Sequence, residues 1–544
     1  MTLYFTMSGP FYFMALLSSL IALFLLKYAI KSRRPQNFPP GPRGLPIIGN
    51  IHQLPLRKGF LVYGLLLSNE LKLFEKSILG PLNAVVLNSY HHVKELFDKR
   101  GAIYSSRPEN YAAQQIICPN NIHILLAEYG PEWRALRKAV QGLLNINADT
   151  ALHPIQVSEA TQTMCQLLED PENYDNHIRR YATAVILASV FGQRGEKFES
   201  PNVQALYHAQ ERFTGILEPG STPPIDAFPF LRSLPEFMSP WKKEAKEIRV
   251  EQIALYYGLL NETKARSSQK SLSPCFMEKL LESQEKDGFT DEHLAYLGGV
   301  LMEGGSDTTS STLLAFVLAM ASHPHVLRKA QEELDRVCGN TRSPGFYDLP
   351  KLEYMRACMN EVHLNQCLIN LDVDLEQTLR WRPMAPVGIP HMLTQDDTYE
   401  GYFIPKGTIM FMNTWAIHMD EDEYDQPEEF MPERFINNKF GCKEGRNLDD
   451  QRRVTYGFGA GRRSCAGQRM AENSLMINMS KMVWLFNVLP LGSEPLDVSI
   501  GSFDDGILVA PKKFPVRFVP RSDVHVQVIR DELEEAKELF ARYK

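Results

Sequence analysis

Phe458-Gly459-Ala460-Gly461-Arg462-Arg463-Ser464-Cys465-Ala466-Gly467 is the most informative stretch of this chain. It places one cysteine in a glycine-rich loop, and a thiolate needs electrostatic help to form at neutral pH and bind a metal. Glycines let the backbone turn so that amide N–H groups point at the sulfur, and a following helix N-terminus adds positive potential. The stretch therefore predicts a socket for one thiolate on one metal. The alternative is a structural cysteine in a buried turn.

At every fixed position this stretch resembles the haem-ligand loop of the cytochrome P450 family. The resemblance implies that Cys465 is the axial thiolate ligand of the iron of haem b. It also implies that Phe458 packs beside the sulfur, that Gly459 and Gly461 shape the loop, and that Arg463 reaches a haem propionate. Over about residues 38–520 it implies a mainly α fold with small β-sheets. In that fold the haem lies between a long central helix and the cysteine loop.

Residues 291–322 are expected to form that long helix, with Thr290 as N-cap and Pro324 beyond its end. Thr308 follows Gly304 by four residues, so its hydroxyl can bond the Gly304 carbonyl and bend the helix. By resemblance, Asp307 and Thr308 are catalytic and deliver protons to dioxygen, while Gly304 and Gly305 leave space for it. The alternative is a polar kink in a buried helix.

Other patterns predict the surroundings of the haem and the secondary structure. Trp133 and Arg137 are four residues apart and share a helix face. By resemblance, this pair and His391 contact the haem propionates. Apolar spacing predicts helices over 89–97, 245–260 and 324–337. It predicts strands over 84–87, 408–412 and 516–519, whereas residues 56–79 lack a clear pattern.

The family's Glu-x-x-Arg element is abnormal here. Arg380 is the expected arginine, and by resemblance Arg434 of Pro432-Glu433-Arg434-Phe435 joins its network, but Gln377 stands where the glutamate belongs. Removing residues 362–377 would place Glu361 three residues before Arg380. Every valine codon begins with GT and one glutamine codon ends in AG, so we hypothesise that 362–377 is a retained intron. In the intact chain Glu376, four residues before Arg380, is the alternative partner.

Composition limits the compartment and the partners. The chain has 544 residues, 44% hydrophobic and 23% charged, which is typical of globular proteins. Its net charge of −7 gives no support for nucleic-acid binding, so no nucleic-acid partner is expected. Its eight cysteines contain no CxxC pair, which favours free thiols in a reducing compartment.

The N-terminus predicts a membrane anchor. No charge occurs over residues 1–26, and Lys27, Lys31, Arg33 and Arg34 follow. About 20 apolar residues can span a bilayer, and positive charge after the span keeps the body cytosolic. We therefore expect a single-pass anchor (1–34) in the endoplasmic reticulum membrane, a proline-rich hinge (35–50), a catalytic domain (51–525) and a charged helical tail (526–544). A cleaved signal peptide and a core helix are the alternatives.

Together these features predict a membrane-anchored haem-thiolate monooxygenase that resembles the fungal secondary-metabolism branch. By resemblance, electrons come from NADPH through a flavoprotein reductase, an NADPH–cytochrome reductase. A basic face of Arg134, Lys138, Arg452, Arg453, Arg462 and Arg469 could dock it. Pocket stretches 116–126, 385–389 and 506–508 are mostly apolar and suit a lipophilic small-molecule substrate. The alternatives are a haem-thiolate isomerase or dehydratase, and a non-catalytic haem binder from a mis-spliced gene.

Overall fold

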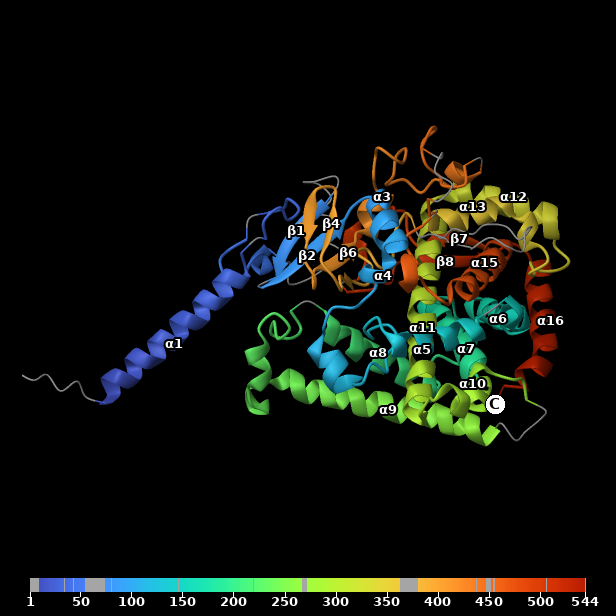
Figure 1. Cartoon of the computed structure of the whole chain (residues 1–544). Coiled ribbons are helices and arrows are strands. Elements are labelled where there is room, and N and C mark those ends of the chain that lie inside the picture. The colour runs from blue at the N-terminus through green and yellow to red at the C-terminus, as the bar shows by residue number, and fades with distance from the viewer. Residues whose placement is uncertain are drawn as a thin grey trace, which may run out of the picture.

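A computed structural model gives the fold of the chain (Figure 1). It describes residues 9–33, 35–42, 44–53, 74–79, 81–144, 146–218, 220–266, 272–362, 380–436, 438–446, 452–453, 455–504 and 506–543.

Helices account for most of the described chain, as predicted. They are α1 (Gly9–Lys31), α3 (Tyr90–Val93), α4 (Gly101–Tyr104), α5 (Pro131–Leu143), α6 (Ile146–Glu169), α7 (Tyr174–Phe191), α8 (Pro201–Leu217), α9 (Pro240–Arg266), α10 (Phe276–Asp287), α11 (Asp291–Ser322), α12 (Pro324–Cys338), α13 (Glu353–Val362), α14 (Thr414–His418), α15 (Gln468–Leu485) and α16 (Asp523–Phe540).

The strands form small sheets. A four-stranded sheet has the order β1 (Phe74–Leu79), β2 (Leu82–Leu87), β6 (Ile409–Met412), β3 (His391–Met392). Two antiparallel pairs are β4 (Asp397–Tyr399) with β5 (Tyr402–Ile404), and β7 (Phe486–Pro490) with β8 (Val516–Pro520). Strands β2, β6 and β8 confirm the three predicted strands. Of the unclear region 56–79, only β1 lies within the described residues.

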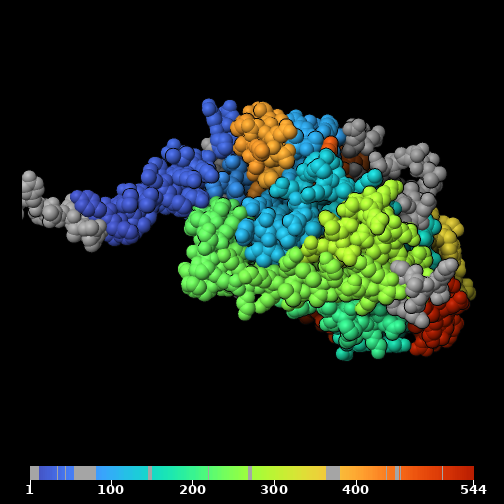
Figure 2. All heavy atoms as spheres, turned by 60° about the horizontal axis from the view of Figure 1, so that its bottom comes forward, coloured from blue at the N-terminus to red at the C-terminus, as the bar shows by residue number. Residues whose placement is uncertain are grey.

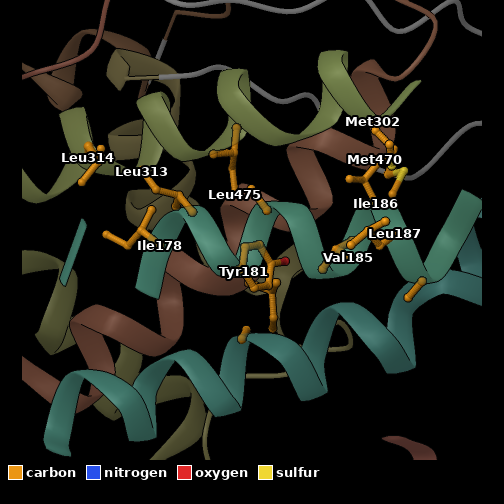
Figure 3. Packing of buried hydrophobic residues seen from close by; sticks show 14 of the residues in the cluster. Ile178, Tyr181, Val185, Ile186, Leu187, Met302, Leu313, Leu314, Met470 and Leu475 are labelled. Carbon is orange, nitrogen blue, oxygen red and sulfur yellow. The ribbon is translucent and has the colours of Figure 1, made fainter. Parts of the chain in front are cut away.

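The core of the helical part lies between α7, α11 and α15. Figure 3 shows Ile178 and Val185 of α7, Leu313 of α11 and Leu475 of α15 packed in one apolar layer. Removing such side chains from water is the main favourable term in folding. This layer holds α11 rigidly through the middle of the domain.

Helix α11 begins and ends where the sequence predicts. The Thr290 hydroxyl accepts a hydrogen bond from the His293 N–H at 3.3 Å, which confirms the N-cap. The helix ends at Ser322, before Pro324 opens α12. Its 32 residues reach across the domain at about 1.5 Å per residue.

Helix α1 projects from the body as a separate rod (Figures 1 and 2). Its residues Tyr12–Lys31 have a mean hydropathy of 2.1 and are not buried, so the helix is long and apolar enough to cross a membrane. At its C-terminal end Tyr28 and Phe24 contact Phe228 and Phe230, with ring centroids 5.2 and 5.1 Å apart. Helix α1 therefore touches the connection between α8 and α9.

Helix α16 covers the expected charged tail. It begins at Asp523 and buries Ile529 and Phe540 against the main core. Glu532 accepts a hydrogen bond at 2.9 Å from Lys481, which lies buried in α15. This segment therefore packs as part of the helical body.

Candidate functional site

The cysteine loop has the tight backbone that its glycines predict. The Cys465 N–H donates to the Phe458 carbonyl at 2.8 Å. Gly459 and Gly461 have φ angles of 79° and 62°, a region that favours glycine. A Cβ atom on Gly461 would lie 2.1 Å from the Phe97 carbonyl oxygen, so no other residue fits there. The loop is therefore pressed against the turn that contains Phe97.

The thiol of Cys465 differs from the other cysteines of the described chain. Cys118, Cys165, Cys275, Cys338, Cys358 and Cys442 are buried and free, whereas Cys465 is solvent-accessible although it lies deep in the protein. Burial raises the pKa of the Cys465 thiol, while a backbone hydrogen bond from Gly467 and the nearby Arg137 lower it. In the described residues no group of three His, Cys, Asp or Glu side chains could hold a metal. A metal at this site would be bound by one thiolate.

A cluster of cations lies beside this loop. Arg463 donates from Nε to the Ser105 carbonyl at 2.8 Å and from Nη2 to the Ala127 carbonyl at 2.6 Å, and its guanidinium lies 4.2 Å from the Trp133 ring centre. Burial, together with two neighbouring arginines, lowers the pKa of Arg463 to about 8. Arg137 is one of these neighbours, and its buried Nε has no hydrogen-bond partner among the described residues.

Arg107 is the other neighbour, and the sequence analysis missed it. It is 4% exposed and donates from Nη1 to the carbonyls of Ile389 and Pro390, both at 2.8 Å. Burial lowers its pKa to about 9. The sequence offers only a weak signal for it, an arginine in a loop after a helix, which is usually solvated.

The three arginines make no ion pair with a carboxylate in the part of the chain that the structure describes. They are Arg107, Arg137 and Arg463. Buried charge without a counter-charge is costly. The cluster therefore fits a ligand that brings negative charge, such as one with two carboxylates.

His391 lies next to this cluster, as predicted, but its ring is already engaged. Its Nδ1 donates to the Tyr104 carbonyl at 2.8 Å, and the ring stacks on Phe97 with centroids 4.1 Å apart. Burial and the nearby Arg107 and Arg463 hold the pKa of His391 well below its usual range. The ring is then neutral and Nε2 is an acceptor, so a contact with a carboxylate requires protonation of Nε2.

The middle of α11 contains the predicted hydroxyl bond. Thr308 Oγ1 donates to the Gly304 carbonyl at 2.7 Å. A Cβ atom added to Gly304 would meet nothing within 4 Å, so open space lies on that side of the helix. This space fits a bound ligand beside α11.

Gly305, in contrast to Gly304, has no open space beside it. A Cβ atom there would lie 2.9 Å from the Ile186 side chain of α7. The expectation that both glycines leave space for dioxygen is therefore corrected. Gly304 faces open space, whereas Gly305 lets α7 approach α11 closely.

Asp307 faces the helices rather than open solvent. Burial raises the pKa of its carboxyl, and the nearby Arg179 opposes the shift. Tyr207 and Ser310 lie close by, since Asp307 contributes to the raised pKa of Tyr207 and its carbonyl accepts a 3.0 Å hydrogen bond from Ser310. Burial therefore makes this carboxyl easier to protonate than a carboxyl in water.

Glu361 is the partner of Arg380. Both side chains are fully buried, and Arg380 Nε donates to Glu361 Oε2 at 2.9 Å while Nη2 donates to Oε1. Arg434 Nε joins the same carboxylate at 3.2 Å. Glu376 and Gln377 lie outside the described residues. Arg380 and Arg434 thus bind Glu361 although residues 362–377 are present, whereas the sequence analysis expected this partner only without those residues.

The predicted basic docking face is smaller than expected. Arg452 is 4% exposed and bonded to Glu423, and Arg453 is 7% exposed and bonded to Asp98. Both are therefore withdrawn from a docking role. The exposed members of the predicted face are Arg134, Lys138 and Arg462.

The sequence profile of the cytochrome P450 family matches residues 39–518. The chain belongs to the cytochrome P450 family. The family's haem has one axial protein ligand and two propionates, and this P450 offers one accessible thiol, three uncompensated arginines and open space at Gly304. The residues present fit that group.

Similar proteins come from fungi. The P450 is 35% identical over 539 residues to cytochrome P450 monooxygenase yanC of Aspergillus niger, covering 96% of this chain and 97% of that protein. It is 36% identical over 527 residues to cytochrome P450 monooxygenase patH of Penicillium expansum, covering 96% of each. It is 34% identical over 546 residues to cytochrome P450 monooxygenase macC of Penicillium terrestre, covering 96% of this chain and 97% of that protein.

Proposed function

We propose that this P450 is a membrane-anchored monooxygenase that inserts one oxygen atom from dioxygen into a lipophilic small molecule in fungal secondary metabolism. The observation that carries the proposal is the accessible Cys465 thiol in its glycine-rich loop. The fungal relatives, each named a monooxygenase, support the reaction class.

The side chains of the site have separable roles. When bound, the haem supplies the iron at which dioxygen is activated. Cys465 provides the thiolate ligand, and the Gly467 N–H stabilises its negative charge. Arg107, Arg137 and Arg463 would neutralise the propionates and orient the group.

Asp307 and Thr308 would move protons. Asp307 would take up a proton more readily than a carboxyl in water, because burial raises its pKa. Thr308 Oγ1 now donates to the Gly304 carbonyl, and turning that hydroxyl toward the open side would present its proton there. Thr308 would thus place a hydroxyl proton beside the space at Gly304, while Asp307 would hold a proton on the neighbouring residue.

Exposed basic residues and the apolar helix α1 suggest how the enzyme receives electrons and attaches to the membrane. We infer that NADPH electrons arrive through a flavoprotein reductase that docks near the exposed Arg134, Lys138 and Arg462. Helix α1 would anchor the enzyme in the endoplasmic reticulum membrane, and the basic residues at its end favour a cytosolic body. Phe237 is 85% exposed in the same connection between α8 and α9 that α1 touches, which supports contact of this connection with lipid.

The decisive test replaces Cys465, the proposed ligand of the haem iron. Cys465→Ala should abolish the absorption band typical of a thiolate-ligated, reduced, carbon monoxide-bound haem. The matched change Cys442→Ala, at a buried free cysteine, should leave that band intact. An unchanged band in Cys465→Ala would contradict the ligand assignment. Product formation without NADPH or dioxygen would instead favour an isomerase or dehydratase.

A further inference from the structure

Glu303 is a buried carboxylate in the residue immediately before Gly304. Glu303 is 9% exposed, and its Oε2 lies 3.2 Å from His123 Nε2. The Tyr256 hydroxyl donates to Oε1, and Gln252 Nε2 donates to the same oxygen at 3.3 Å. The proposed chemistry gives these groups no role.

The cluster joins four parts of the chain. His123 comes from the loop before α5, Tyr256 and Gln252 from α9, and Glu303 from α11. Gln210 of α8 adds a bond from its Nε2 to the Glu303 carbonyl at 3.2 Å. Among the described residues no lysine or arginine pairs with Glu303. A buried carboxylate without a fixed cation is a poor source of stability compared with apolar packing, so a role in recognition is the better explanation.

Hydrogen-bond donors and acceptors identify what the cluster can still bind. Tyr256 and Gln252 donate to the carboxylate, so Glu303 acts as an acceptor and His123 Nε2 is its third donor. In the neutral imidazole, His123 Nδ1 is then an acceptor. This atom is buried and has no partner within the described chain, and the same is true of Gln252 Oε1. The named donors of the cluster are therefore all bonded to Glu303, whereas two acceptor atoms, His123 Nδ1 and Gln252 Oε1, receive no hydrogen bond within the described chain.

The cluster borders the haem site. Glu303 directly precedes Gly304, which faces open space. His123 belongs to the same turn as Ile124 and Ala127, whose carbonyls hold Arg463 of the cysteine loop at 3.2 and 2.6 Å. The other face of the His123 ring packs on Phe213 of α8, with centroids 5.2 Å apart. The polar cluster thus lies beside the turn that holds Arg463 and directly before the open space at Gly304.

We propose that His123, held by Glu303, accepts a hydrogen bond from a hydroxyl group of the substrate. The inference rests on the proposed function and narrows the substrate class to a mostly apolar alcohol or phenol. The hydroxyl would fix one end of the molecule at the wall formed by α8, α9 and α11. One carbon edge would then face the space at Gly304. His123 is the contact residue, and Glu303 and Tyr256 position its ring.

Spectral titration of the haem-loaded enzyme tests this assignment without turnover. The probes are 4-propylphenol, its methyl ether, which keeps the shape but lacks the donor, and 4-propylacetophenone. Wild type should bind the phenol about 10-fold to 100-fold more tightly than the ether, the range expected for one buried hydrogen bond to an imidazole. His123→Phe should bring that ratio to within about threefold while the ether's affinity stays unchanged.

A matched pair of tyrosine variants separates positioning from general packing. Tyr256→Phe removes one donor to Glu303 and should lower the phenol-to-ether ratio several-fold. Tyr296→Phe is the control, because the Tyr296 hydroxyl donates to the Ile117 carbonyl at 3.0 Å and not to Glu303. The Tyr296 ring also packs edge-on against Tyr256, 5.4 Å away, so the two variants disturb the same layer. If His123→Phe does not retain haem, this pair decides the question.

Three results would overturn the proposal. They are equal binding of phenol and ether by wild type, an undiminished ratio in His123→Phe, and tighter binding of the ketone than of the phenol. The last result would mean that His123 donates rather than accepts. Failure of the proposed function would look different, since wild type would then lack the thiolate-type spectrum whatever the probe.

Discussion

Helix α13 and residues 380–381 make contacts that are typical of one continuous helix. The Trp381 N–H donates to the Glu361 carbonyl at 3.2 Å, although twenty positions separate them in sequence. Without residues 362–377, Trp381 would follow Glu361 by four positions, the spacing of an α-helical hydrogen bond. Arg380 would follow it by three, the spacing of a side-chain pair on one helix face. We therefore predict that deleting 362–377 preserves the fold and stabilises it.

The size of the gain follows from chain closure. Bringing together two chain positions that sixteen residues separate costs about (3/2)RT ln 16, or about 2.5 kcal/mol, and the deletion removes that cost. Unfolding entropy is roughly 2.1 cal/mol/K per residue, so for a chain of this length the melting temperature should rise by about 2 °C. The buried ion pair between Glu361 and Arg380 would be retained.

The assay compares two deletions by thermal melting and by the carbon monoxide spectrum. Deleting 363–377 is the control, because keeping Val362 turns Arg380 and Trp381 by about 100° around the helix. In that protein Arg380 would follow Glu361 by four positions, so the pair could still form. The turn would, however, take the Arg380 guanidinium from the Pro427 and Glu429 carbonyls and the Trp381 indole from the Glu428 carbonyl. The control should therefore melt below the 362–377 deletion. The reasoning is refuted if the 362–377 deletion melts below the full chain or lacks haem. Sequencing the mature transcript tests the retained-intron hypothesis separately, and a message that encodes 362–377 would contradict it.

Three further predictions concern the site and the anchor. Thr308→Ala should keep haem but divert NADPH electrons to hydrogen peroxide, because its hydroxyl beside Gly304 is lost; an unchanged ratio of product to NADPH would contradict the proton role. Arg107→Ala should release haem to apomyoglobin at least about tenfold faster, since a buried charge partner of the propionates is gone, whereas the exposed Arg134→Ala should not. Deleting residues 1–30 should move the enzyme from the membrane pellet to the supernatant with its spectrum intact; glycosylation of sequons placed in the body would contradict the cytosolic orientation.

The sequence was enough to predict those features that depend on residues close together in the chain. The turn around Cys465 depends on glycines within a few residues, and the cap of α11 depends on Thr290 and the residues directly after it. The bond from Thr308 to Gly304 spans four residues of one helix. Helix α1 is recognisable because an uncharged apolar run is a property of composition alone. Short-range geometry leaves few alternatives in such cases.

Long-range packing decided the rest. Arg107 resembles a solvated loop residue until the chain folds its carbonyl partners Ile389 and Pro390 around it. Arg452 resembles a docking residue in sequence, yet Glu423 buries it. Burial is a property of the neighbours that the fold supplies, and the charge of a side chain does not reveal it.

Long-range packing also gives identical residue types different surroundings. Gly304 and Gly305 are adjacent and identical, but they point about 100° apart on α11, so one meets open space and the other meets Ile186. Glu303 is one more acidic residue in a helix until α9 and the loop of His123 surround it with donors. The sequence thus determined the family, the tight turn around Cys465 and the long apolar helix α1. The tertiary structure decided which charges are buried and which buried polar atoms lack a partner among the described residues, because both depend on contacts between segments far apart in the chain.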